Sequence, residues 1–176
     1  MRKFTKSVLG GLAMTSLLYA APGVWADDDR DQFTARLIGF EEVAAGSAAV
    51  STTGRGRFSA RIRGDAIDWE LSYERLEGTT TLFAHVHFGQ KDVPGGVSFF
   101  LCGGGGRPAC TNPSGSFSGT ATAADIIGPA NQGIAAGEIA ELIRAMRAGI
   151  TYANVHTNKH PTGEIRGQIR GDREDD

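Results

Sequence analysis

The chain has 176 residues, enough for one domain with a hydrophobic core, and its 18 basic and 20 acidic side chains give a formal net charge of −2. Nucleic acids require a basic surface, so a chain with this charge balance is not expected to bind them. Beyond the N-terminal segment no stretch is apolar enough to cross a bilayer, so we expect no membrane span.

The first 26 residues have the layout of a secretory signal peptide. Arg2 and Lys3 give a basic start, residues 8–21 are mostly apolar and small, and a small-residue cleavage site ends at Ala26. We therefore expect cleavage near Ala26 and export, either to the periplasm or out of the cell. The apolar run is too short and too rich in glycine for a membrane anchor.

Export would leave a mildly acidic mature protein. Removing residues 1–26 takes away three basic and no acidic residues, which changes the net charge from −2 to −5. Acidic tails at residues 27–31 and 172–176 flank a single expected domain at residues 32–171. We interpret both tails as solvated ends rather than as functional acidic tracts.

Alternation of apolar and polar side chains predicts a series of short strands in this domain. In chain order they are expected at residues 32–38, 57–63, 67–74, 80–88, 97–101, 116–121, 150–157 and 164–170. The one interruption is residues 136–148, where apolar side chains recur at the spacing of one helical face. The pattern predicts an all-β fold, an antiparallel β-sandwich or barrel of the copper–zinc superoxide dismutase-like or immunoglobulin-like kind, with one short α-helix.

Two cysteines, Cys102 and Cys110, flank a glycine-rich loop between two of the expected strands. In an exported protein an even pair that spans a short flexible loop favours a disulfide. A thiolate metal site is the alternative interpretation, and an oxidising compartment favours the disulfide over it. Closing so short a loop stabilises the fold by about 2–3 kcal/mol in the chain-entropy model.

All four histidines lie in two short segments, residues 83–89 and 154–161. His85 and His87 are one residue apart within an expected strand, so their side chains point to the same face. His156 lies in the later strand at residues 150–157. If the two strands are neighbours in the sheet, same-face residues come within about 5 Å at their Cβ atoms, close enough for imidazoles to share an ion.

This arrangement predicts a mononuclear metal site formed by His85, His87 and His156, with His160 in the following turn as a fourth ligand. A set of imidazoles suits copper or zinc and holds calcium or magnesium poorly, so the expected cofactor is copper or zinc, or none. In the metal-free alternative, the histidines are hydrogen-bonding positions on a sheet surface.

Tyr152 and Asn154 share the predicted face of His156, so they are candidates to orient the metal ligands, although a plain surface role fits them as well. Glu164 and Arg166, on the final strand, are expected to form structural pairs. We find no nucleophile–base arrangement, no phosphate loop and no catalytic pair of carboxylates, so the sequence does not predict an enzyme.

Several segments resemble the CHRD domain, a domain named for the animal developmental protein chordin and widespread in exported bacterial proteins. The segments that carry the resemblance are residues 84–89, 125–129, 141–149 and 154–169. Residues 33–43 and the strand at 69–73 have residue types similar to those of the family. The resemblance therefore extends from about Phe33 to Arg170. The chain departs from the usual pattern at Ala44, where the family often has proline, and in its glycine-rich disulfide loop.

The resemblance specifies the domain more firmly than its function, and three classes of function stay open. The first is an exported binding protein with a histidine site for copper or zinc. The second is a metal-free extracellular module that binds a periplasmic or extracellular protein or a matrix. The third is a redox enzyme similar to superoxide dismutase, which also has two histidines one residue apart on a strand. A copper–zinc pair of that type needs more than four imidazoles, so only a single copper would be possible here.

Overall fold

The computed structural model describes Met1 and residues 31–43 and 49–171. Beyond Met1, the predicted signal peptide lies outside the described residues, and so does the C-terminal acidic tail. Of the N-terminal tail only Asp31 is described. Its carboxylate pairs with Arg147 at 2.6 Å between Oδ1 and Nη2, so this residue is tied to the domain rather than left in solvent.

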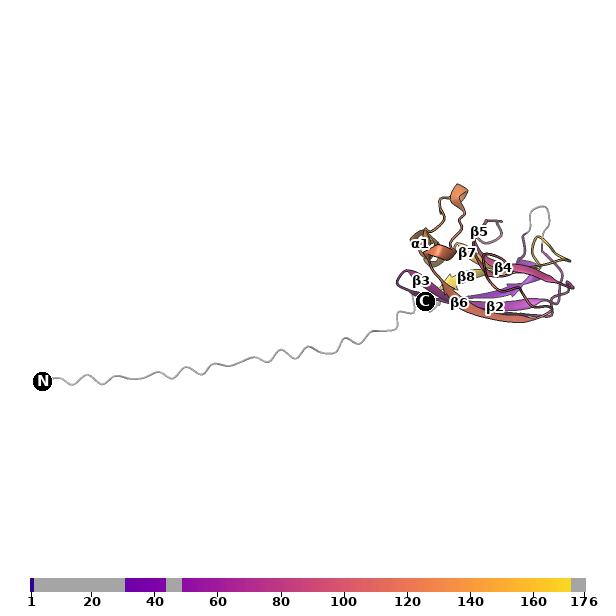
Figure 1. The fold of residues 1–176 in the computed structure, drawn as a ribbon, viewed down its shortest axis with the longest axis horizontal. Coiled ribbons are helices and arrows are strands. Elements are labelled where there is room, and N and C mark those ends of the chain that lie inside the picture. Colours follow the sequence, from indigo (N-terminus) through magenta and orange to yellow (C-terminus); the bar gives the residue numbers. More distant parts are fainter. Residues whose placement is uncertain (2–30, 44–48, 172–176) are drawn as a thin grey trace.

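Eight antiparallel strands form one sheet in the order β5-β4-β7-β8-β1-β2-β3-β6, which curves into a nearly closed barrel (Figure 1). The strands are β1 Gln32–Ile38, β2 Arg55–Arg63, β3 Ala66–Glu74, β4 Thr81–Phe88, β5 Gly96–Cys102, β6 Gly115–Ala121, β7 Thr151–Thr157 and β8 Ile165–Gly171. The predicted antiparallel all-β fold with one helix is therefore confirmed. The strand order places β4 directly beside β7, which is the neighbour relation that the histidine prediction required.

The helices are short. Helix α1 spans Ile139–Arg147, and the described residues include the 3₁₀ turns η2 Gly39–Glu41, η3 Ala123–Asp125 and η4 Ala130–Gln132. Helix α1 begins later than predicted because Gly137 has a left-handed backbone with φ of 87° and Glu138 occupies the N-cap. Leu142 and Met146 are fully buried on its inner face, so α1 covers one end of the barrel.

The core lies inside the curved sheet and consists of alternate strand residues. Its largest fully buried apolar side chains are Phe33, Leu37, Phe58, Ile67, Leu71, Phe99, Leu101, Leu142, Met146, Ile165 and Ile169. Burial of each such side chain stabilises the fold by about 1.5–3 kcal/mol relative to exposure. This core fixes which side of every strand faces outward, and the three strand histidines His85, His87 and His156 lie on that outward side.

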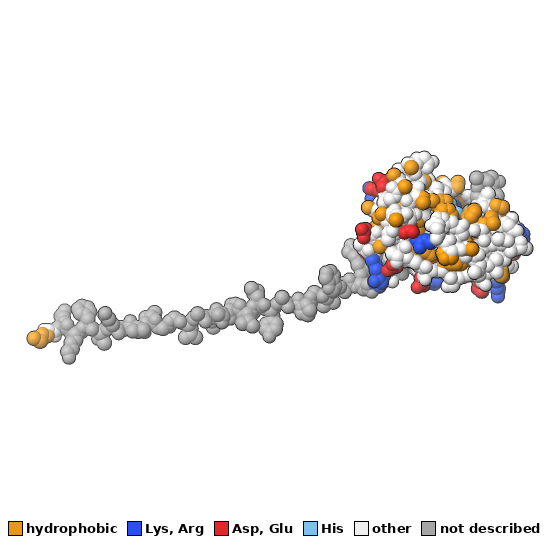
Figure 2. All heavy atoms as spheres, in the orientation of Figure 1, with side chains coloured by type: hydrophobic (Ala, Val, Ile, Leu, Met, Phe, Trp, Pro, Cys, Tyr) orange, Lys and Arg blue, Asp and Glu red, His pale blue; other side chains and the backbone are white. Residues whose placement is uncertain are grey.

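The outward face over β2 and β3 is solvated and charged. Arg55 pairs with Glu74 and Arg63 with Asp68 across the two strands, at 2.6 and 2.8 Å. In the view of Figure 2, lysine and arginine side chains are dispersed among acidic ones rather than gathered in one patch. Among the helices in the described part of the chain, none has the length and apolar character that a membrane crossing needs.

The predicted disulfide between Cys102 and Cys110 is present. It closes the glycine-rich loop at the end of β5, and this loop lies against the ring of Phe100 in the same strand. A Cβ atom at Gly104 would meet the Phe100 ring at 2.5 Å, so glycine is required for this close approach.

Candidate metal centre

Three of the four histidines converge on the outward face of β4 and β7. The two strands pair with Phe83 opposite His156, His85 opposite Asn154 and His87 opposite Tyr152. Directly paired positions in an antiparallel pair share a face, so this register brings the imidazoles together. One ring nitrogen from each of His85, His87 and His156 lies within 4.8 Å of the other two.

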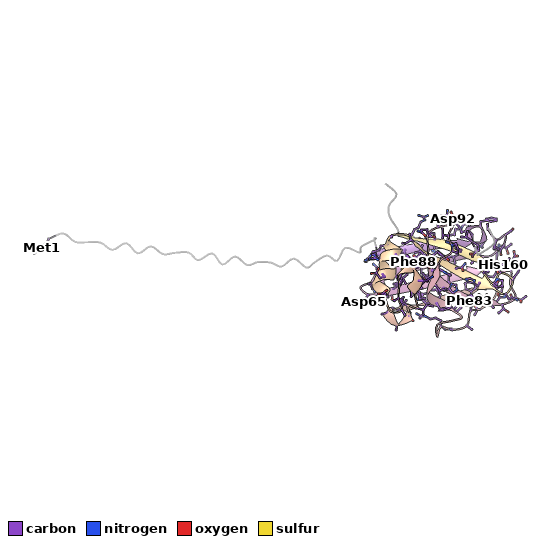
Figure 3. All side chains as sticks on the ribbon, turned by 90° about the horizontal axis from the view of Figure 1, so that it is seen from above. Met1, Asp65, Phe83, Phe88, Asp92 and His160 are labelled. Carbon is purple, nitrogen blue, oxygen red and sulfur yellow. A yellow bond between two sulfur atoms is a disulfide. The ribbon has the colours of Figure 1, made fainter. Side chains whose placement is uncertain are left out.

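His160 is not a member of this cluster. It lies in the turn between β7 and β8, near the Phe83 end of β4, and Figure 3 labels both residues. The backbone of His160 holds the turn together, because its carbonyl accepts from the amides of Thr157 and Gly163 at 3.3 and 3.1 Å. The structure thus gathers three of the predicted ligands and leaves the fourth in the adjoining turn.

Two of the clustered rings have a fixed orientation. His87 Nδ1 lies 2.9 Å from the carbonyl oxygen of Gly95, and His156 Nδ1 lies 3.0 Å from that of Pro161. A carbonyl oxygen can only accept, so each Nδ1 carries the proton and each Nε2 has a free lone pair. Both Nε2 atoms are buried and have no hydrogen-bond partner among the described residues.

Burial keeps the three rings neutral. Desolvation lowers the pKa of His85 from 6.5 to about 2, with smaller contributions from His87 and His156. Desolvation likewise lowers the pKa of His87 and of His156 to about 4, against an opposing effect of the bonds to Gly95 and Pro161. His85 Nδ1 is also buried and finds no partner within the described ranges. At neutral pH the site therefore presents unprotonated nitrogens, as a metal requires.

Aromatic side chains pack around the histidine cluster. The Phe83 ring centre lies 4.8 Å from that of His156, the Phe100 ring packs edge-on to His85 at 5.3 Å, and the Tyr152 ring stacks on His87 at 4.5 Å. Tyr152 was one of the two predicted orienting residues. It acts through its ring rather than through a hydrogen bond to a histidine, and its hydroxyl accepts from the amide of Gly95 at 3.0 Å.

A family model for the CHRD domain matches residues 33–169. The chain belongs to the CHRD domain family. No curated protein and no solved structure matches the chain. The match contains both histidine-bearing strands and the disulfide loop, so the cluster lies wholly within the CHRD domain.

In this CHRD domain a buried arginine, Arg166, adjoins the cluster. It is 2 % exposed, and its guanidinium carbon lies 3.5 Å from the centre of the Tyr152 ring. Its Nη2 donates to the carbonyls of Gln90 and Val93, both at 3.0 Å, in the loop between β4 and β5. We expected Arg166 to form a structural pair, but its partners are the Tyr152 ring and two backbone carbonyls. These partners could not be predicted, because backbone carbonyls in a distant loop leave no signal in the sequence.

A buried carboxylate, Glu42, faces the same region of the CHRD domain. Asn154, the second predicted orienting residue, donates to Glu42 Oε2 at 2.6 Å and to the Ile165 carbonyl at 3.1 Å, so it contacts an acid rather than a histidine. Desolvation raises the pKa of Glu42, against the bonds from Val43 and Asn154 and the charge of Arg166. Sequence reasoning gave Glu42 no role, because its partner Asn154 is 112 positions away along the chain.

Proposed function

We propose that this exported CHRD-domain protein binds one copper or zinc ion through His85, His87 and His156. The observation that carries the proposal is the convergence of three buried ring nitrogens that lack partners among the described residues. Metal-ligating histidines commonly donate their second ring nitrogen to a backbone carbonyl, which fixes the tautomer and the orientation of the ring. His87 and His156 have that arrangement.

The energetics of burial favour a bound ion over a metal-free role. A buried polar atom without a hydrogen bond costs about 1–3 kcal/mol, and this cluster holds three such nitrogens. Other buried atoms, such as Trp69 Nε1, Ser98 Oγ and Nε2 of His160, also lack partners in the described part of the chain. Those atoms belong to single side chains, whereas the three nitrogens lie close enough together for one ion to satisfy them all.

The spacing of the nitrogens is compatible with binding after a small adjustment. Copper or zinc at about 2.0–2.1 Å from each nitrogen would bring the nitrogens to about 3.5 Å from one another. With the present upper limit of 4.8 Å, the widest pair would have to approach by at most about 1.3 Å, which small side-chain rotations supply.

Export supports the same proposal. The N-terminal segment has signal-peptide features, and the disulfide between Cys102 and Cys110 suits an oxidising compartment. In such a compartment both cysteines are consumed by the bridge and no thiolate is left in the described part of the chain, whereas imidazoles suit copper and zinc.

The test is metal analysis and calorimetric titration of the exported protein, purified without a metal-binding tag. We expect one equivalent of copper or zinc per chain, and loss of that binding in His85→Ala and in His156→Ala. His160→Ala is the matched control, because it removes the one histidine outside the cluster and should leave both stoichiometry and affinity unchanged.

Two outcomes would reject the site. Absence of binding in the folded wild-type protein would favour the metal-free module. Tight stoichiometric binding that survives both His85→Ala and His156→Ala would place the metal elsewhere. A large loss of affinity in His160→Ala would instead restore His160 as the fourth ligand, with a movement of the turn between β7 and β8.

A further inference from the structure

We propose that the histidine site selects copper(I) over copper(II) and zinc(II). This inference rests on the proposed metal function and specifies which ion the site takes. Three features of the site carry it: the number of donors, the exclusion of water and the fixed positive charge of Arg166.

The donor set is limited to three neutral nitrogens. No aspartate, glutamate or cysteine in the described part of the chain joins the three histidines, and both cysteines are bonded to each other. Zinc(II) in proteins is almost always four-coordinate, with a water in the fourth position where the protein supplies three ligands. Copper(I) has a filled d shell and is stable with three ligands, so three imidazoles complete its coordination.

The aromatic rings around the three histidines leave little room for a water ligand. The nitrogens that face the cluster are buried, and the rings of Phe83, Phe100 and Tyr152 pack against the three imidazoles. The Phe100 ring is itself covered by the glycine-rich disulfide loop. A divalent ion would therefore be held without a fourth ligand and without the anionic ligand that would offset its charge.

Arg166 adds a positive charge beside the site. Its guanidinium carbon lies 3.5 Å from the Tyr152 ring centre, and that ring stacks on His87 at 4.5 Å, so the cation is no more than about 8 Å from the His87 ring. Because repulsion scales with the charge of the ion, it penalises a divalent ion more than a monovalent one.

Glu42 offsets this repulsion only in part. Its carboxylate is hydrogen-bonded to Asn154 and does not belong to the ligand cluster. Burial raises the pKa of Glu42, against the bonds from Val43 and Asn154. Glu42, Asp92 and Glu41 are the acidic groups that act on Arg166, and none of them joins the three histidines, so the positive charge beside the imidazoles still disfavours a divalent ion more than a monovalent one.

The test compares the three ions on the same purified protein. Copper(I) would be titrated without oxygen against a chromogenic copper(I) chelator, and copper(II) and zinc(II) against chelators of their own. We expect one equivalent of copper(I) bound at least about 100-fold more tightly than zinc(II) or copper(II). Equal or tighter binding of either divalent ion would overturn the selectivity and leave the metal site standing. No binding of any ion would overturn both proposals.

Variants of Arg166 separate charge from structure. Arg166→Gln removes the charge, and we expect about a tenfold gain in zinc(II) affinity relative to copper(I). Arg166→Lys keeps the charge and should keep the wild-type selectivity. Unchanged selectivity in a folded Arg166→Gln protein would contradict the electrostatic argument. If Arg166→Gln fails to fold, the wild-type and Arg166→Lys titrations still decide whether copper(I) is preferred.

Discussion

The outward face of the sheet has two halves that differ in how far loops and turns bury their side chains. Over β2 and β3 the side chains are solvated: Arg55 and Glu74 pair with half of each side chain exposed, beside an open groove of about 590 Å³. Over β4, β7 and the start of β8 most of the outward side chains are buried, with His85 only 4 % exposed and Arg166 only 2 %. The same alternation of residues therefore produces an open charged surface in one half and a buried polar cluster in the other.

The difference comes from segments outside the strands. The loop between β4 and β5 provides the Gly95 carbonyl for His87 and the carbonyls that bind Arg166. The turn between β7 and β8 provides the Pro161 carbonyl for His156. Backbone carbonyls therefore fix the rings of His87 and His156, whereas Arg55 and Glu74 in the solvated half are held by an exposed ion pair.

Acid should affect the buried half most strongly. Histidines in the unfolded chain titrate near 6.5, whereas the pKa is about 4 for His87 and His156 and about 2 for His85 in the fold. Between these values the unfolded state binds more protons, so the metal-free protein loses stability as the pH falls from 6.5 towards 4. Each histidine contributes up to about 1.4 kcal/mol per pH unit. Urea unfolding at pH 7.5, 6.0 and 5.0 would measure the loss.

A matched variant tests the source of this acid sensitivity. His85→Phe keeps an aromatic ring at the same place and removes one titrating group, so its stability should fall less steeply over the same pH range. A wild-type stability that stays level between pH 7.5 and 5.0 would show that protons reach the rings in the folded state and that burial does not keep them neutral.

The sequence predicted the fold and the ligand face well because both depend on local periodicity. All eight strands were located to within about two residues, and the shared face of His85, His87 and His156 follows from period two together with the pairing of β4 and β7. Burial of that face could not be predicted. It depends on Arg166, on Phe100 and on two loops, whose conformations are set by contacts between residues far apart in the chain.

The next largest effect should come from Glu164, a fully buried carboxylate beside β8. It accepts from the hydroxyls of Thr52 and Thr157 and from the amide of Glu77, each at 2.7 Å. Glu164→Met keeps the length of the side chain and removes every acceptor, which leaves three donors unpaired. We expect a loss of about 3–5 kcal/mol in the free energy of unfolding, measured with urea.

Glu164→Gln is the informative companion to this change. It retains one acceptor oxygen and should recover part of the stability lost in Glu164→Met. Equal losses in the two variants would mean that the negative charge matters and that the hydrogen bonds alone do not account for the effect.

Opening the disulfide should have a somewhat smaller effect on stability and a specific effect on the metal. Cys102→Ala with Cys110→Ala removes the closed loop, which costs about 2–3 kcal/mol in the chain-entropy model. The same loop covers the Phe100 ring, so we also expect copper to dissociate several-fold faster, as a chelator-chase experiment would show. A lower stability with an unchanged dissociation rate would mean that Phe100 needs no support from the loop.

The smallest effect should follow the same glutamate-to-methionine change in the solvated half. Glu74 accepts from Arg55 Nε and Nη2, both at 2.6 Å, and half of its side chain is exposed. Water can replace the lost bonds of Arg55, so Glu74→Met should change the free energy of unfolding by no more than about 0.5 kcal/mol. Metal affinity should stay at the wild-type value, because β3 contributes no ligand. A loss comparable to that of Glu164→Met would mean that hydrogen-bond count, rather than burial, sets the strength of the carboxylate contacts on both halves of the sheet.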